Sequence, residues 1–244
     1  MGRFAEYIEQ DHEPLRWGCS LTYKLYLNRT LLSRSRFFLA SRYIMRRIGF
    51  KYVKMIEFVR PLDAPIPIIE TKIRVEIKPF LAEDANNKSY DRICFTQGDN
   101  SPSHDKTLSR VASGKETCLV AIVNGEVAGY VWLLFKGTNY ELAIEIVENF
   151  AECDGLVYQL NVFAEFKKKY IASKLIGEGL CYFKSKGYRR CYSYVESDNL
   201  PSIKSFEKNK FSQVRVITCL RILKFKRVSE IFITESCKNG EIGC

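Results

Sequence analysis

A lysine cluster at the start of a predicted helix is the part of this sequence best suited to bind an anion. Lys167, Lys168 and Lys169 follow a strand-like run and precede apolar residues at helical spacing. The first N–H groups of a helix have no intrahelical acceptor, and the helix dipole adds positive charge there. The small residues Ala172 and Ser173 would let a phosphate approach the backbone. The segment therefore predicts a site for a phosphate-bearing ligand.

Apolar spacing and turn residues place this helix in an ordered series of strands and helices. Asn124-Gly125 lies between two apolar runs and supplies the positive φ angles of a type I′ turn, which predicts a β-hairpin. Gly187 is a typical residue for the C′ position just after the predicted helix, and Asn199 is a typical N-cap of a second, shorter helix. The expected strands cover residues 73–77, 119–123, 126–135, 156–162, 191–195, 211–217 and 219–225. This order predicts an α/β fold with a mixed central β-sheet flanked by helices.

The stretch 156–211 resembles the GNAT superfamily of acyl-CoA-dependent N-acetyltransferases. The family pattern is a strand, then V-x-P-x-x-(R/Q)-x-x-G-x-(G/A)-x-x-L opening a helix, then a strand and N-x-x-(S/A)-x-x-x-(Y/F)-E-K-x-G-F. Here Val162 to Leu175 reads V-F-A-E-F-K-K-K-Y-I-A-S-K-L, and Asn199 to Phe211 reads N-L-P-S-I-K-S-F-E-K-N-K-F. With the upstream hairpin, the resemblance spans about residues 72–226.

The resemblance implies acetyl-CoA as co-substrate, with no metal. The residues that it assigns to CoA binding are Leu160, Val162, Lys167, Lys168, Lys169, Tyr170, Ile171, Ala172, Ser173, Asn199 and Phe206. Lys167 replaces the usual Arg or Gln, and Tyr170 stands where the family prefers Gly. Phe206 stands where many members carry the tyrosine that protonates the departing thiolate. Because a phenyl ring cannot donate a proton, another group would have to act as the acid.

As the resemblance implies, an amine attacks the thioester directly in a ternary complex. Catalysis then needs a group that accepts the ammonium proton and a group that protonates the thiolate. Gln159 could orient a water, Glu196 could receive the proton through water, and Tyr194 could act as the acid. Other residues carry the same functional groups. Glu145 and Asp154 could act as the base in place of Glu196, and Tyr158 or Tyr192 could act as the acid in place of Tyr194.

The formal charge of +10 is concentrated near the N-terminus. Between Arg16 and Arg60 there are 11 Lys or Arg residues and one acid, Glu57, interleaved with apolar residues at helical spacing. This segment, residues 16–60, predicts one of two structures. It is either a surface for a membrane, nucleic acid or another anionic partner, or a helix packed on the catalytic domain with a solvated basic face.

Proline and charge patterns divide the chain into three expected parts. Pro61, Pro65 and Pro67 are typical of a linker after the basic segment. We therefore expect a basic, helical N-terminal extension with this linker over residues 1–68. A GNAT-like domain would follow over 69–228, and a polar tail over 229–244.

Composition bears on compartment and on metal binding. Nine cysteines without a CxxC pair, and only two histidines, argue against a zinc site and favour free thiols. No apolar run approaches the roughly 18 residues of a membrane span, and the N-terminus has no signal-peptide pattern. These features predict a cytoplasmic protein.

We therefore expect an acyltransferase that moves an acetyl or related acyl group from CoA to a primary amine of a small metabolite or amino sugar. The alternative is a catalytically weak GNAT-fold binding module whose basic N-terminal arm contacts a membrane, nucleic acid or protein partner. The acceptor and the oligomeric state have no recognisable motif in this sequence.

Overall fold

Eight β-strands form one mixed sheet in the part of the chain that the computed structural model describes, namely residues 50–81, 83–84, 93, 104–135, 137–141, 146–223 and 225–233. The order across the sheet is β10-β9-β1-β8-β7-β4-β3-β2. Neighbouring strands run antiparallel except β7 and β8, which are parallel. The strands are β1 (Phe50–Pro61), β2 (Glu76–Pro79), β3 (Glu116–Val123), β4 (Glu126–Leu134), β7 (Asp154–Val162), β8 (Arg190–Glu196), β9 (Ser212–Ile222) and β10 (Phe225–Phe232).

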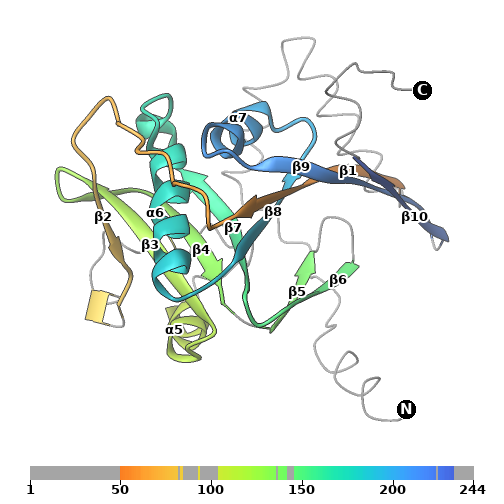
Figure 1. Ribbon diagram of the computed structural model, residues 1–244, viewed down its shortest axis with the longest axis horizontal. Helices are drawn as coiled ribbons and strands as arrows, with labels where there is room; N and C mark the ends of the chain where they lie inside the picture. Colours follow the sequence, from red (N-terminus) through yellow and green to blue (C-terminus); the bar gives the residue numbers. More distant parts are fainter. Residues whose placement is uncertain are drawn as a thin grey trace, which may run out of the picture. The chain divides into compact units, whose positions relative to one another are not determined.

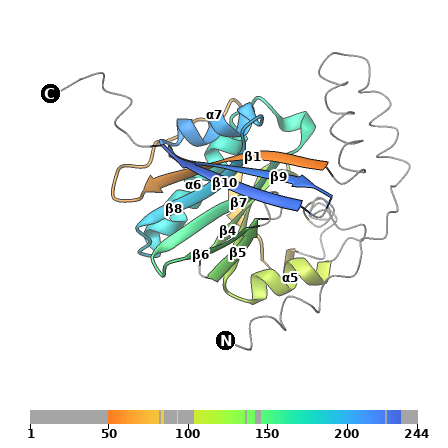
Figure 2. The same cartoon turned by 90° about the vertical axis from the view of Figure 1, so that its right-hand side faces the viewer.

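Helices and a separate hairpin cover the two faces of this sheet (Figure 1 and Figure 2). Helices α6 (Ile171–Ser185) and α7 (Leu200–Lys208) lie on one face, which we call the helical face. Helix α5 (His104–Ala112) and the hairpin of β5 (Gly137–Glu141) and β6 (Ile146–Phe150) lie on the opposite face. A short 3-10 helix, η3 (Ala164–Phe166), precedes α6. The expected mixed sheet flanked by helices is thus confirmed.

Local sequence signals are reproduced at several turns and helix ends. Asn124 and Gly125 both have positive φ angles between β3 and β4, as a type I′ turn requires. Gly187 has a φ of 82° two residues after α6 ends. The side chain of Asn199 caps α7 by accepting a hydrogen bond from the Ser202 N–H at 3.3 Å. Each of these features is decided within a few residues, so the sequence could predict it.

The first strand corrects the expected N-terminal boundary. We expected residues 1–68 to form a helical extension and linker, but residues 50–61 form β1, which pairs with β8 on one side and β9 on the other. The helical spacing on which that expectation rests lies between residues 31 and 48 and does not extend into this strand. The core contains Val53 and Phe58, which point to opposite faces of the sheet.

The C-terminal boundary also differs from the expectation. Residues 229–232, expected in a polar tail, complete β10, which pairs with β9 from Phe225–Ile222 to Phe232–Arg215. The two short strands expected at 211–217 and 219–225 are a single strand, β9, followed by this hairpin partner. Residues 1–49 and 234–244, including most of the basic segment, lie outside the described residues, as does Glu145.

Close packing between α6 and the sheet depends on two glycines. A Cβ added at Gly155 of β7 would lie 2.3 Å from the ring of Phe183. A Cβ added at Gly179 of α6 would lie 2.9 Å from the end of the Leu133 side chain. Phe183 and Leu133 are completely buried. The helix can therefore approach β4 and β7 only because these two positions have no side chain.

We expect Gly155→Ala to destabilise the fold more than Gly179→Ala. The Phe183 ring is rigid and enclosed, so the added methyl group should cost about 1–3 kcal/mol of unfolding free energy. The clash at Gly179 is with the flexible end of a leucine, and alanine in a helix recovers up to about 1 kcal/mol over glycine. Urea unfolding of the two variants and the wild type measures the difference. Equal losses would contradict this account of the packing.

Candidate active site

The parallel strands β7 and β8 separate partway along their length. They pair only at Asp154–Arg190, Gly155–Cys191 and Leu156–Tyr192. Beyond these pairs β7 remains with β4 as far as Val162, whereas β8 remains with β1 as far as Glu196. The sheet therefore opens between the carboxyl ends of β7 and β8 (Figure 1).

A bulge in β7 accompanies this opening. The register between β4 and β7 shifts between Tyr130 and Trp132, and Gln159 has a φ of 48°. Just beyond, β4 and β7 approach so closely that a Cβ on Gly129 would lie 2.6 Å from the backbone oxygen of Asn161. The bulge and the glycine together set the course of residues 160–162, which line the adjoining pocket.

That pocket, of about 680 Å³, lies between the end of β7, the start of α6 and one side of α7. Its volume falls within the usual range for small-molecule sites, roughly 300–1,000 Å³. Five lysines and no carboxylate residue line it. The lining residues are Lys72, Leu160, Asn161, Val162, Phe166, Lys167, Lys168, Tyr170, Ile171, Ala172, Ser173, Asn199, Pro201, Ser202, Lys204, Ser205 and Lys208. The pocket therefore has the electrostatics of an anion site.

The start of α6 adds backbone donors to this positive pocket. The first intrahelical hydrogen bond runs from the Lys174 N–H to the Tyr170 oxygen at 3.0 Å. The N–H groups of Ile171, Ala172 and Ser173 precede that bond, and no side-chain cap is made by Tyr170. All three residues line the pocket, so the helix start can bind phosphate oxygens.

Tyr170 occupies the position of the family glycine with a glycine-like backbone. Its φ is 64°, in the left-handed region, where a non-glycine residue is disfavoured by roughly 1–2 kcal/mol. Its ring lies 3.7 Å from the Lys208 ammonium and 5.3 Å from that of Lys72, measured to the ring centroid. Such cation–π contacts contribute about 0.5–1 kcal/mol each at exposed sites, which offsets much of that cost.

Nine of the eleven residues predicted to bind CoA line this pocket, and two do not. The Lys169 ammonium lies 5.3 Å from the centre of the Phe166 ring instead. Phe206 is buried in the core, stacked on Phe58 at 5.8 Å and edge-on to Phe211 at 5.0 Å. Phe206 is therefore not among the residues that line the pocket.

The three predicted catalytic residues lie outside the pocket lining, Gln159 on β7 and the other two on β8. Gln159 is exposed at the bulge, where its Oε1 accepts a hydrogen bond from Arg110 Nη1 at 3.1 Å. Glu196 is half-buried at the end of β8, opposite Met55. Tyr194 lies on the face opposite α6 and α7, where its hydroxyl donates to Glu57 Oε1 at 3.1 Å.

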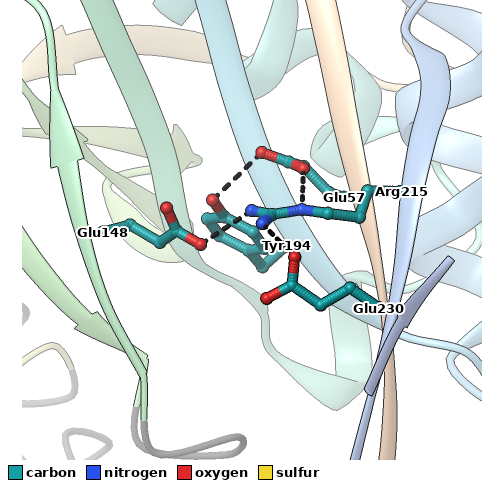
Figure 3. Close-up of polar contacts among 5 residues, drawn as sticks. All are labelled: Glu57, Glu148, Tyr194, Arg215 and Glu230. Carbon is teal, nitrogen blue, oxygen red and sulfur yellow. Dashed lines mark hydrogen bonds and ion pairs between the residues drawn. The ribbon is translucent and has the colours of Figure 1, made fainter. Parts of the chain in front are cut away.

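Tyr194 belongs to a network centred on Arg215 (Figure 3). The Arg215 guanidinium contacts Glu57 of β1 at 2.6 Å, Glu148 of β6 at 2.7 Å and Glu230 of β10 at 2.8 Å. Burial raises the pKa of Tyr194, and the Glu57 carboxylate raises it further. The network ties the β5–β6 hairpin to the sheet, and the raised pKa keeps the Tyr194 phenol protonated to a higher pH than an ordinary tyrosine.

A second polar cluster lies on the same face across the opening. Arg110 of α5 donates through Nη2 to the Tyr158 hydroxyl at 2.5 Å and through Nε to Glu116 at 2.6 Å. Its guanidinium stacks over the Trp132 ring at 3.6 Å. Burial raises the pKa of Tyr158 as well. Because a general acid works best with a pKa near the operating pH, neither phenol is tuned for that task.

Sequence reasoning missed part of the pocket and the contacts that hold it together. Lys204 and Lys208 lie one helical turn apart on α7, a spacing that could have identified them; Lys72 carried no such signal. Asn209, completely buried, donates through Nδ2 to the Ser173 oxygen in the first turn of α6 at 2.9 Å. Arg60 of β1, also buried, donates to the Asn209 oxygen at 2.5 Å. These contacts fix α7 against the start of α6.

The structure also bears on metal and membrane association. Among the described residues, no group of three or more His, Cys, Asp or Glu side chains is placed to hold a metal ion. In the same part of the chain no helix is both long enough and apolar enough to cross a bilayer.

A separated parallel strand pair with a phosphate-type pocket at its carboxyl end defines an acyltransferase fold of the kind that the sequence resembles. The sequence profile of the acetyltransferase (GNAT) family matches residues 85–211. The chain belongs to the GNAT acetyltransferase family, which uses acetyl-CoA.

Solved structures with this fold share little sequence with the chain. A GCN5-related N-acetyltransferase from Sphaerobacter thermophilus is 12% identical, with a TM-score of 0.50 over 80% of this chain and 56% of its own. A protein from Novosphingobium aromaticivorans assigned to the GNAT family is 13% identical, with a TM-score of 0.49 over 76% of this chain and 67% of its own. AAC(6')-Iy, solved with a CoA-containing bisubstrate analogue, is 14% identical, with a TM-score of 0.47 over 57% of this chain and 92% of its own.

This chain therefore spans little more than half of the Sphaerobacter protein. The search of curated protein sequences gave no match.

We expect Tyr194 to make stability fall at high pH. Its folded-state pKa is raised, so its contribution is complete below about pH 10, the pKa of an unfolded tyrosine. Above that pH the unfolded chain ionises while the folded chain does not, and the free energy of unfolding falls. In Tyr194→Phe the fall should be less steep by up to about 1.4 kcal/mol per pH unit. Denaturant unfolding of both proteins from about one pH unit below to about one unit above the reference tyrosine pKa tests this. If the unfolding free energy of the two proteins falls with pH at the same slope, the prediction is contradicted.

Proposed function

We propose that this chain transfers an acetyl or related acyl group from CoA to a primary amine of a small metabolite or amino sugar. The observation that carries the proposal is the pocket at the start of α6, with five lysines and no carboxylate residue. CoA carries three phosphate groups, so its binding requires positive charge and free backbone donors in one place. The pocket combines both beside the opening between β7 and β8.

In this proposal each part of the pocket has its own role toward CoA. The N–H groups of Ile171, Ala172 and Ser173 would bind the diphosphate, since they lack intrahelical acceptors. The lysines would neutralise its charge; they are Lys72, Lys167, Lys168, Lys204 and Lys208. Leu160 and Val162 would bind the pantetheine through their backbone, and Asn199 would contact the same arm from α7.

Bound acetyl-CoA would supply the activated acyl group and the thiolate leaving group. The chain would hold the thioester where β7 and β8 separate, so that an amine could reach its carbonyl carbon. Direct attack would convert the amine to an amide as the carbon–sulfur bond breaks, and the ammonium proton would leave through water.

Glu196, Gln159 and Tyr194 are the groups that we propose for proton handling. Glu196 would accept the proton through water at the end of β8, and Gln159 would orient that water from the bulge. Tyr194 would protonate the thiolate only by exchanging its hydrogen bond to Glu57 for one to sulfur. Its raised pKa makes this a weak acid, so we expect slow turnover.

One observation favours the alternative, a GNAT-fold binding module with little catalysis. None of the three proposed proton-handling residues lines the pocket, and the Phe206 ring is buried. In that case CoA binding would persist, and the basic residues 16–60 would contact a membrane, nucleic acid or protein. Of these, only residues 50–60 lie in the described part of the chain, within β1.

For the compartment we propose the cytoplasm. Cysteines 118, 153, 181, 191 and 219, all in the described part of the chain, are free thiols, as is usual in a reducing compartment.

Acetyl-CoA titration by calorimetry tests the binding site with a matched pair of lysines. Lys168→Ala should weaken binding by about ten- to a hundredfold, because charge-assisted hydrogen bonds contribute about 1.5–3 kcal/mol. Lys169→Ala removes the same charge from the next residue, which does not line the pocket, and should change affinity less than about threefold. Equal effects would mean that both lysines attract CoA only through long-range electrostatics and that Lys168 makes no direct contact with it.

Ala172→Asp provides a stricter test of the helix start. An acidic residue in the first turn of a helix favours folding, so the variant should remain native. The new carboxylate would face the proposed diphosphate and should weaken acetyl-CoA binding at least a hundredfold. Unchanged affinity in the folded variant would overturn the assignment of this pocket to CoA.

Thiol release across a panel of primary amines then separates the enzyme from the binding module. If Glu196 accepts the proton, Glu196→Gln should lower kcat at least tenfold while the affinity for acetyl-CoA stays unchanged. Tyr194→Phe should lower kcat by a similar factor if that phenol protonates the thiolate. Binding of acetyl-CoA without acyl transfer to any amine would instead support the module.

A further inference from the structure

Half of the large apolar side chains exposed in the described residues lie in one short segment. Six of twelve belong to residues 222–233, at the turn after β9 and along β10. Phe225, Ile231 and Phe232 are 63%, 67% and 68% exposed. Within the described part of the chain, β10 is the last strand on its side of the sheet. An edge strand of eight residues with exposed aromatic side chains is a typical site for pairing with another chain.

The hydrogen-bonding direction of β10 limits how another strand can pair with it. The Ile233 N–H donates to the Val214 oxygen of β9 at 2.8 Å, continuing the regular register of the two strands. The backbone N–H and C=O groups of successive residues point alternately to the two edges of a strand, so odd-numbered residues of β10 direct theirs toward β9. Lys226, Val228, Glu230 and Phe232 therefore direct theirs toward the outer edge.

We propose that β10 pairs antiparallel with β10 of a second copy of this chain, about a two-fold axis at Val228. Outward-directed residues must lie opposite outward-directed residues, so the axis has to pass through a residue and not between two. With the axis at Val228, Lys226 lies opposite Glu230 of the second copy, and the same pair forms again across the axis. Phe225 then lies opposite Ile231 of the second copy, on the helical face.

Neighbouring registers lack this complementarity. An axis at Arg227 or at Glu230 places two like charges directly opposite each other, which is destabilising. An axis at Ser229 places Lys226 opposite Phe232 and Val228 opposite Glu230. Only the axis at Val228 matches opposite charges on one face and apolar residues on the other. This self-complementarity favours a second copy of this chain as the partner of the β10 edge.

The in-chain contact of Glu230 is compatible with this pairing. Its Oε2 accepts from Arg215 at 2.8 Å, and its side chain remains 36% exposed. A carboxylate accepts several hydrogen bonds, so the same group can receive the Lys226 ammonium of the second copy. The dimer would thus connect the Arg215 networks of two chains through one continuous sheet.

Sedimentation velocity of the full-length protein over a range of concentrations tests the dimer. Wild type should show a concentration-dependent dimer, and Lys226→Glu should raise its dissociation constant at least about tenfold, because two cross-strand attractions become repulsions. Arg227→Glu is the matched control: it makes the same charge change at the next residue, which lies opposite Ser229 of the second copy. It should shift the constant less than about threefold.

Circular dichroism establishes that both variants fold before they are compared. A wild-type protein that stays monomeric at every concentration would overturn the proposal and would fit an edge covered by residues 1–49 or 234–244. Equal weakening by the two variants would overturn the register.

Cysteine crosslinking tests the position of the axis directly. With the axis at Val228, Val228→Cys places two thiols opposite each other at a Cα separation of about 5.5 Å, within disulfide range. Ser229→Cys would lie opposite Arg227 of the second copy and should not crosslink. On a non-reducing gel we expect a covalent dimer for Val228→Cys alone, above the background of the wild type. Crosslinking of Ser229→Cys to the same extent would place the axis elsewhere.

Discussion

The separation of β7 from β8 determines where this fold can bind a ligand. Two parallel strands that stop pairing leave the backbone groups on their facing edges without ladder partners, and these groups need water or a ligand as partners instead. Here β4 supports β7 as far as Val162, and β1 supports β8 as far as Glu196. The opening is therefore bordered on both sides by antiparallel ladders, of which the one between β4 and β7 contains the bulge, and a ligand can use the backbone between them.

The strand that supports β8 also connects the two faces of the sheet. Arg60 of β1 reaches the helical face, where it bonds Asn209, and Asn209 in turn bonds Ser173 at the start of α6. Glu57 of the same strand faces the other side, where it binds Arg215 and Tyr194. A segment that sequence analysis placed outside the domain thus contributes to the pocket on one face and to the charged network on the other.

What the sequence could predict was local. The type I′ turn at Asn124-Gly125, the cap at Asn199 and the phosphate-type helix start each depend on neighbouring residues. The position of β1 depends on pairing with strands that are distant in the sequence, from Pro61–Arg190 of β8 to Phe50–Ile222 of β9, and no local pattern encodes that. The surroundings of Tyr158 and Tyr194 likewise have no local signal, because partners distant in the sequence, Arg110 and Glu57, determine where each hydroxyl binds.

The distribution of charge along the sequence also differs from its distribution in the folded structure. The excess of positive charge lies in residues 16–60, whereas the remainder of the chain after residue 60 is close to neutral. Nevertheless that nearly neutral part forms the strongly basic pocket, because the fold gathers lysines from the segment before β2, the start of α6 and one side of α7. Two of its carboxylates, Glu148 and Glu230, lie instead on the opposite face around Arg215, together with Glu57 of β1. A sheet that separates charge in this way can bind an anionic acyl donor even though its own net charge is small, because the local field depends on which side chains share a face.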